Sequence, residues 1–206
     1  MDWSSLGLAA VASSTSGLNL YATVLTLGLM QRYGWLQLPG EWNPLSHTWV
    51  LALAAILFVI EFIADKVPYL DSAWDAIHTF IRIPAGAILM AAAAVADVDP
   101  SLRLAAGLIG GSLALTTHSA KATARLAANA SPEPFSNVLL STLEDIATVF
   151  LLGAAASHPI LAGIALVIVL GICAALIYTC FKFTRMFFAK LSRWLTSPPA
   201  ESTSSD

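Results

Sequence analysis

The stretch Asp65–Arg82, DKVPYLDSAWDAIHTFIR, places three aspartates, a lysine, a histidine and an arginine between two apolar segments. The chain of 206 residues is otherwise poor in charge, because 57% of its residues are hydrophobic and only 11% are charged. Its mean hydropathy of +0.75 is well above that of a water-soluble domain. The composition predicts an integral membrane protein, in which this charged stretch needs a specific explanation.

Six apolar segments outline the expected architecture. Each is bounded by charged or turn-forming residues, and they cover residues 6–30, 49–64, 83–96, 102–117, 138–156 and 160–181. A membrane-spanning helix needs about 20 mostly apolar residues, so the chain has room for about six spans with short connections. We therefore expect an all-α membrane protein with one transmembrane domain over residues 1–196 and a disordered cytoplasmic tail over residues 197–206.

The basic residues are distributed unevenly about these six segments. One side of the predicted membrane has Lys66, Arg82, Lys121, Arg125, Lys182, Arg185, Lys190 and Arg193, whereas the other side has only Arg32 and Arg103. Short cytoplasmic loops are enriched in lysine and arginine. This asymmetry predicts a multi-pass protein with both termini in the cytoplasm.

Within the charged stretch, Asp71, Asp75 and His78 follow one another at helical spacing and share one face of a helix. We expect this helix over about residues 68–80, lying in the membrane interface with Trp74 as its anchor. Two interpretations stay open. Either the acids are solvated on the membrane surface, or they face inward as a cation-binding cluster or a proton relay. The three residues are also the candidate ligands of a divalent metal.

Other ionisable residues lie within or beside the apolar segments, where an unpaired charge is costly and usually marks a functional site. Glu61 lies inside the second segment, and Glu144 and Asp145 lie in the fifth. The full set of candidate residues for binding a substrate or coupling ion is Asn19, Glu61, Asp65, Asp71, Asp75, His78, Arg82, His118, Lys121, Glu144 and Asp145.

The first apolar segment is interrupted by the polar stretch SSTSGLN, residues 13–19. Two explanations stay open: a helix interface built from small residues, or a helix broken at Ser16 and Gly17 whose backbone ends line a cavity. The similar stretch TTHSA, residues 116–120, lies in the fourth segment, and an acid lies in each of the segments that follow. This correspondence suggests an inverted 3+3 repeat, in which paired broken helices mark a binding site.

The acids of the charged stretch need cations nearby to stay ionised and close together. We therefore expect the helix over residues 68–80 to pack against the end of the fourth segment, with at least one acid within ion-pair reach of Lys121 or Arg125. Lys121 and Arg82 are the expected partners of Glu61 and Glu144 or of an anionic substrate. His118 is the expected proton acceptor near neutral pH.

Four stretches together resemble a bacterial membrane-protein family that is catalogued only as domain of unknown function 4126. They are GLNLYATVLTLGL at residues 17–29, EFIADKVPYLDSAWDAIHTFIRIPAGA at 61–87, HSAKATARLAANASPEPFSN at 118–137 and LEDIA at 143–147. The resemblance covers about Leu6 to Pro159 and implies a small multi-spanning protein of the bacterial inner membrane. It implies no activity.

Three functions compete for this arrangement. The leading hypothesis is a small secondary transporter or permease, coupled to protons or cations, whose substrate the sequence does not identify. The second is a membrane-embedded enzyme that uses a divalent metal on a lipid or phosphate headgroup, with Lys121 and Arg125 binding phosphate. The third is a non-catalytic scaffold or assembly protein. The absence of a nucleophile motif or a recognised metalloenzyme signature favours a function other than catalysis.

The expected partners follow from these hypotheses. They are the lipid bilayer, a small solute, ion or lipid, and a second copy of the chain. No nucleic-acid partner is expected, and the sequence identifies no cofactor.

Overall fold

The computed structural model describes residues 3–39, 41–93, 99–130 and 135–196. The predicted tail over residues 197–206 lies outside them. In this part of the chain all regular structure is helical, and the elements are α1 (Trp3–Leu18), α2 (Leu20–Arg32), the short 3-10 helix η1 (Asn43–Ser46), α3 (Thr48–Ala64), α4 (Leu70–Ala92), α5 (Pro100–Asn129), α6 (Phe135–Ser157) and α7 (Pro159–Thr196). The predicted all-α fold is confirmed.

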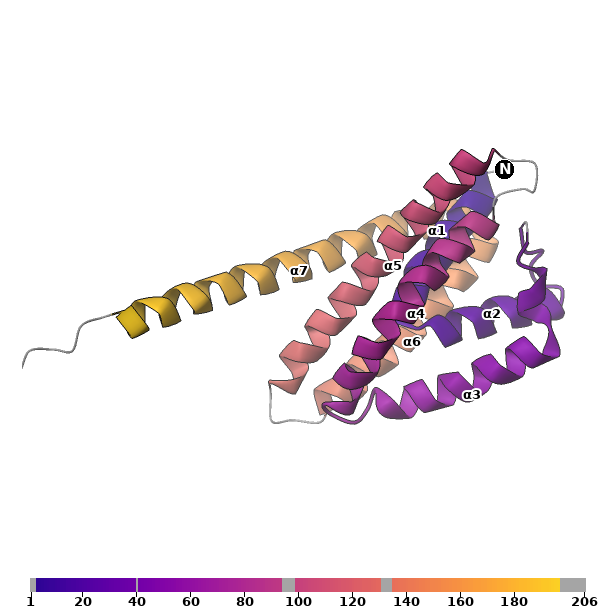
Figure 1. Ribbon diagram of the computed structural model, residues 1–206. Coiled ribbons are helices and arrows are strands. Elements are labelled where there is room, and N and C mark those ends of the chain that lie inside the picture. Colours follow the sequence, from indigo (N-terminus) through magenta and orange to yellow (C-terminus); the bar gives the residue numbers. More distant parts are fainter. Residues whose placement is uncertain (1–2, 40, 94–98, 131–134, 197–206) are drawn as a thin grey trace, which may run out of the picture.

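Helices α1, α4, α5 and α6 form a bundle, and α2 and α3 run beside each other at a steep angle to it and extend to one side (Figure 1). Helix α7 starts against the bundle through Ala162 and Leu166 and then leans away from it. Close packing depends on glycine, since a side chain on Gly110 would overlap the backbone of Gly86 and the side chain of Met90. Small residues let membrane helices approach closely in this way.

Three helices are long and apolar enough to cross a membrane: Leu70–Ala92, Phe135–Ser157 and the Pro159–Lys190 part of α7. Helix α3, Thr48–Ala64, is apolar but shorter. The described residues therefore support a membrane protein, with fewer clear spans than the six predicted. The difference arises because the first apolar segment is divided between α1 and α2, and α5 is rich in small and polar residues.

The polar stretch at residues 13–19 is a true break between two helices. Helix α1 ends at Leu18, and Asn19 has an extended backbone with φ −146° and ψ 102°. Its side chain caps α2 by accepting a hydrogen bond of 2.9 Å from the backbone N–H of Ala22. Asparagine is among the preferred capping residues because its side chain replaces a missing helical acceptor. Each of our two explanations is thus confirmed in part: the helix is broken, but at Asn19 rather than at Ser16 and Gly17, and Gly17 packs closely against Ala114 of α5, as a small-residue interface requires.

Helix α5 has no corresponding break. Residues 116–120 lie inside one continuous helix of 30 residues, and the hydroxyls of Thr116 and Thr117 bond back to carbonyls of the preceding turn. A paired break in the two halves of the chain, which the repeat hypothesis included, is therefore wrong for α5. The hydroxyl stretches still meet, because Thr117 Oγ1 also donates to the carbonyl of Ser14 at 2.7 Å.

Helices α1 and α5 run in the same direction. Ser14 lies beside Thr117, and Leu18 lies beside Lys121, so the pairing advances along both chains together. The six-span prediction required the first and fourth segments to run in opposite directions, and it is wrong on this point. The start of α1 lies at the end of the bundle opposite the α3–α4 connection (Figure 1). The prediction that both termini lie on one side of the membrane does not follow from this arrangement, because α1 stops inside the bundle and α2 turns aside.

Helix α4 unites two elements that the sequence analysis separated. The predicted interfacial helix over residues 68–80 and the third apolar segment form one helix from Leu70 to Ala92, which continues through Pro84. Asp71 and Asp75 are buried in the bundle. The interpretation in which these acids are solvated on the membrane surface is therefore wrong. The apolar residues Ile77 and Phe80 instead form the exposed face of the helix.

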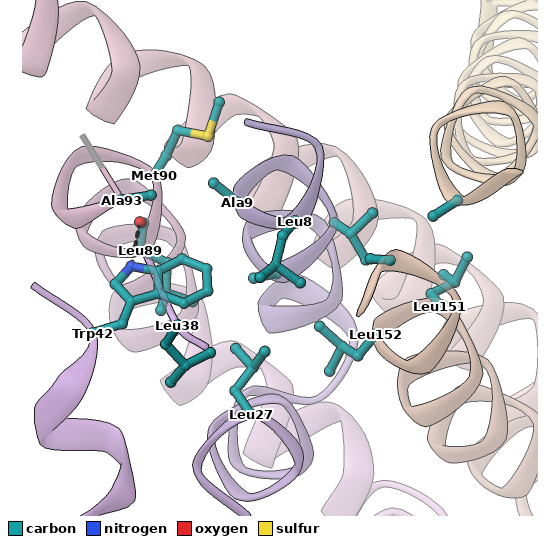
Figure 2. Close-up of a cluster of buried hydrophobic side chains, with 14 of the residues drawn as sticks. Leu8, Ala9, Leu27, Leu38, Trp42, Leu89, Met90, Ala93, Leu151 and Leu152 are labelled. Carbon is teal, nitrogen blue, oxygen red and sulfur yellow. Dashed lines mark hydrogen bonds between the residues drawn. The ribbon is translucent and has the colours of Figure 1, made fainter. Parts of the chain in front are cut away.

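The end of the bundle at which α1 begins has an apolar core. Leu8, Leu27, Leu89 and Leu152 bring together α1, α2, α4 and α6 (Figure 2). Trp42, from the connection after α2, inserts into this core, and its Nε1–H donates to the carbonyl of Leu89 at 2.9 Å. The apolar core fixes one end of the helices, and the ionisable residues gather at the other.

Candidate functional site

The ionisable residues come together from four helices in one group, which we call the charge cluster: Glu61, Asp65, Asp71, Asp75, Arg82, Lys121, Arg125, Glu144 and Asp145. Helical spacing explains the convergence, because the members from α4 are separated by four and seven residues and those from α5 by four. Helices α4 and α5 therefore each present their charged side chains on one inward face.

Arg82 is completely buried and joins α3 to α4. Its Nη2 lies 2.6 Å from Oε1 of Glu61, and its Nη1 lies 2.8 Å from Oδ1 of Asp75. Both contacts are short, as expected for hydrogen bonds between ionised groups. Arg82 therefore pairs with one oxygen of each of two buried carboxylates.

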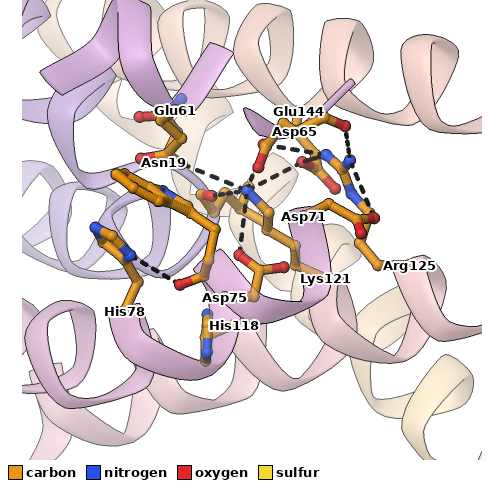
Figure 3. Close-up of polar contacts among 12 residues, drawn as sticks. Asn19, Glu61, Asp65, Asp71, Asp75, His78, His118, Lys121, Arg125 and Glu144 are labelled. Atoms are coloured by element: carbon orange, nitrogen blue, oxygen red, sulfur yellow. Dashed lines mark hydrogen bonds and ion pairs between the residues drawn. The ribbon is translucent and has the colours of Figure 1, made fainter. Parts of the chain in front are cut away.

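Lys121 lies at the centre of the charge cluster (Figure 3). Its Nζ lies 2.8 Å from Asp65, 3.4 Å from Glu61, 3.4 Å from Glu144 and 3.7 Å from Asp75. One ammonium group thus interacts with carboxylates from α4, α6 and the end of α3. It is the common partner that holds these helices around α5.

Arg125 lies one turn further along α5. Its Nη2 lies 2.7 Å from Oε2 of Glu144 and 3.1 Å from Oδ2 of Asp65, and its Nη1 lies 3.8 Å from Oδ2 of Asp71. Asn129, one more turn along, donates to both oxygens of Asp71 at 3.0 and 3.2 Å. The prediction that an acid of the charged stretch would reach Lys121 or Arg125 is confirmed.

The break between α1 and α2 opens directly onto the charge cluster. Nζ of Lys121 donates to the carbonyl of Leu18, the last residue of α1, at 3.0 Å. Nδ2 of Asn19 donates to Oδ1 of Asp145 at 2.9 Å. A helix carries partial negative charge at its C-terminal end and partial positive charge at its N-terminal end. The cation therefore lies at the end of α1 and the acid at the start of α2, as these partial charges favour.

The two candidate histidines, His78 and His118, have different partners. His78 stacks on Trp74 with ring centroids 4.3 Å apart, its Nε2 lies 2.9 Å from the Tyr21 hydroxyl, and its Nδ1 lies 2.8 Å from the Trp74 carbonyl. His118 Nδ1 lies 3.1 Å from Nη1 of Arg82. Because a guanidinium group only donates, this His118 nitrogen accepts, and the ring is neutral in this arrangement. Protonation of His118 at Nδ1 requires loss of the Arg82 contact.

The three candidate metal ligands do not converge. Asp71 faces Asn129, Asp75 faces Arg82, and His78 faces Tyr21. Across the described ranges, no group of three or more histidine, cysteine, aspartate or glutamate side chains has an arrangement that could hold a metal ion. These residues do not form the divalent site that their helical spacing suggested.

Carboxylates outnumber cations in the charge cluster. Six acids face three buried cations, with Lys66 as a fourth at the margin. Lys66 lies 3.3 Å from the Ser141 hydroxyl and 3.0 Å from the centre of the Phe62 ring, and burial lowers the pKa of its ammonium group. At least two carboxylates thus lack a matching cation. Burial of an uncompensated charge is costly, so the arrangement favours uptake of positive charge.

Unsatisfied atoms point to the same conclusion. In the described part of the chain, the buried carboxylate oxygens without a hydrogen-bond partner are Glu61 Oε2, Asp65 Oδ1, Asp75 Oδ2 and Asp145 Oδ2. Nε of Arg82 and of Arg125 also lacks a partner. Buried polar atoms are nearly always paired in proteins, so a group of exceptions needs a functional or structural reason.

A cavity of about 210 Å³ lies beside the charge cluster, between α4 and α5. Its lining residues are Ser72, Asp75, Ala76, Thr79, His118, Ala122, Arg125 and Leu126. This space can hold several waters, each of which occupies roughly 30 Å³ in the liquid. The cavity places open space next to Asp75, His118 and Arg125.

Sequence reasoning missed several polar residues of the site. Asn129 lies on the inward face of α5, four residues after Arg125. Asn137 and Ser141 lie on the inward face of α6, where Asn137 donates to Asn129 at 2.6 Å. Their helical spacing from the charged residues could have identified them. Tyr21 could not have been found in this way, because its contact with His78 depends on the direction that α2 takes after the break.

Comparison with protein-family models identifies a match over residues 6–201 to the family described as Domain of unknown function (DUF4126). The match extends beyond the resemblance noted in the sequence and includes α7. Comparisons with the curated proteins and with the solved structures gave no match. Because the family model covers nearly the whole chain, the protein belongs to this family of unknown function.

Proposed function

We propose that the protein is a small secondary transporter or permease, coupled to protons or cations, of the bacterial inner membrane. The observation that supports this most strongly is the break between α1 and α2, whose two ends meet Lys121 and Asp145 inside the bundle. Discontinuous helices of this kind bind substrates and coupling ions in many transporters, because the exposed helix ends carry partial charges.

The composition of the charge cluster supports the same function. An excess of carboxylates with unsatisfied oxygens can take up and release positive charge, and the adjacent cavity offers space for a small polar solute. Each buried cation has at least two carboxylate partners, so a movement of one helix can exchange partners without leaving a cation unpaired.

The orientation is part of the proposal. The end of the bundle with Lys66, Lys121 and Arg125 faces the cytoplasm, in accordance with the excess of basic residues on that side. The start of α1 then lies on the outer side, and α3 and α5 are embedded in the bilayer with the three longer apolar helices. Exposed Leu53, Ile56 and Ile63 give α3 an outward face that suits lipid.

Reconstitution into proteoliposomes tests the proposal. Currents would be recorded on a solid-supported membrane after jumps in pH, in Na⁺ and in a panel of small polar solutes. The expected result is a charge movement in the unmodified protein that disappears in Glu61→Gln while the protein stays folded. No current or flux above that of empty liposomes, under any gradient, would remove the proposal.

A non-catalytic scaffold is the second candidate, and the extensive pairing of Arg82, Lys121 and Arg125 favours it. In that case the charge cluster serves only to hold helices together. The same preparations separate the two functions, because a scaffold predicts that Glu61→Gln reduces stability and that no variant alters flux.

A further inference from the structure

Asp145 differs from the other acids of the charge cluster. In the described part of the chain it has no ion pair, whereas each of the other five acids has a cation within 4.0 Å. Oδ1 of Asp145 accepts from Asn19, but its Oδ2 is buried without a partner. The charged groups that act on it from neighbouring elements are Lys121, Asp65 and Lys66.

Thr148 provides an independent observation on the same face of α6. It lies three residues after Asp145, its side chain is completely buried, and its hydroxyl has no hydrogen-bond partner in the described structure. A helical threonine usually donates to the carbonyl four residues earlier. Thr142 on the same helix does so, with its hydroxyl 2.8 Å from the carbonyl of Val138.

The break in the first apolar segment lies beside Asp145. Helix α1 packs against α6 in the opposite direction, and Asn19 contacts Asp145. This register places buried Thr15, one turn before Asn19, at the level of Thr148.

We propose that Asp145 Oδ2 and Thr148 Oγ1 bind a sodium ion at the α1–α2 break. Both ligands are oxygen atoms, as a hard cation requires, and the single carboxylate matches a monovalent charge. Both atoms are buried without a hydrogen-bond partner, and their residues lie one turn apart on the same face of α6. An ion bound by both would satisfy them, and its positive charge would offset the excess of acids. This inference rests on the proposed function, in which the ion is the coupling ion.

The test measures Na⁺ binding without requiring transport. Purified protein in nanodiscs would be heated in NaCl, KCl or choline chloride at equal ionic strength, and ²²Na⁺ binding would be measured in parallel. The variants are Asp145→Asn and Thr148→Val. The matched controls are Asp99→Asn at an exposed helix cap and Thr142→Val on the exposed face of α6.

The expected result is a saturable rise in melting temperature that is specific for Na⁺ in the unmodified protein and both controls. In Asp145→Asn and Thr148→Val this shift disappears, and ²²Na⁺ binding falls to background. Equal effects of the three salts, or a Na⁺ shift retained in Thr148→Val, would overturn the site. Na⁺ binding without any flux would leave the site intact and remove transport, whereas proton-driven flux without Na⁺ binding would remove the site alone.

Discussion

The two ends of the helix bundle are held together by different interactions. At one end, leucines from α1, α2, α4 and α6 form one apolar cluster with Trp42, whose indole N–H has a carbonyl partner (Figure 2). At the other, the same bundle packs charged side chains in a network that leaves four carboxylate oxygens unsatisfied (Figure 3). The apolar end is held by hydrophobic packing and the Trp42 hydrogen bond, whereas the charged end has unpaired carboxylate oxygens that can bind positive charge.

The comparison also predicts which charges stabilise the fold. Carboxylates exceed cations in the charge cluster, so each cation compensates more than one acid, whereas the loss of one negative charge leaves the others better compensated. Substitution of a cation should therefore be much more damaging than neutralisation of an acid.

The largest expected effect is that of Arg82→Met. The substitution leaves Glu61 and Asp75 buried without their closest cation, and it should lower the free energy of unfolding by about 3–5 kcal/mol. Denaturant titration in detergent micelles, followed by circular dichroism, measures this change.

Arg103→Met is the matched control, because Arg103 and Glu41 form a half-exposed pair at 3.4 Å. Its effect should be about 0–1 kcal/mol. Equal losses for the two substitutions would contradict the distinction between the charged end and the surface.

The next effect is that of Gly110→Ala, at the contact between α4 and α5 that connects the two ends. The added methyl group would overlap the backbone of Gly86, so the helices must separate, at a cost of about 1–3 kcal/mol. Gly107→Ala is the control, since a Cβ there lies 3.5 Å from the carbonyl of Ala87 at ordinary contact distance. Equal thermal stability of the two variants would contradict the close packing of α4 against α5 at Gly110.

A smaller effect is expected at the apolar end. Trp42→Phe keeps an aromatic ring in the core but removes one of the two donors to the carbonyl of Leu89, which keeps its bond from the Ala93 N–H, and the loss should cost about 0.5–1.5 kcal/mol. Trp49→Phe, at a side chain that is 86% exposed, should leave stability unchanged. Thermal unfolding measures both changes, and equal stability of the two variants would contradict the burial of Trp42.

Part of this arrangement could be predicted from the sequence. Helical periodicity placed the acids of the charged stretch on one face, and the need for compensation predicted their approach to Lys121 and Arg125. Helical periodicity is a local property of one segment, and charge compensation depends only on the signs of the charges. Neither depends on the direction in which the other helices run.

The direction of α1 and the break at Asn19 could not be predicted in the same way. Hydropathy measures whether a segment is apolar enough to span, but it contains no information on whether the chain turns aside within the bundle. The break depends on a single capping hydrogen bond of Asn19 and on tertiary contacts with Lys121 and Asp145. The predicted metal ligands failed for a related reason, because each found a different partner on another helix.

The central claim is that the charge cluster is a working site rather than structural support, and Glu61→Gln tests it most directly. Glutamine has the same shape and can still accept the hydrogen bond from Arg82, but it removes one charge from a group with too many acids. Melting temperature and ion-coupled flux would be measured on the same reconstituted preparation. Our account predicts a fold that is unchanged to within about 1 kcal/mol and a flux reduced to that of empty liposomes. A variant that keeps full flux, or one that unfolds as readily as Arg82→Met, would contradict it.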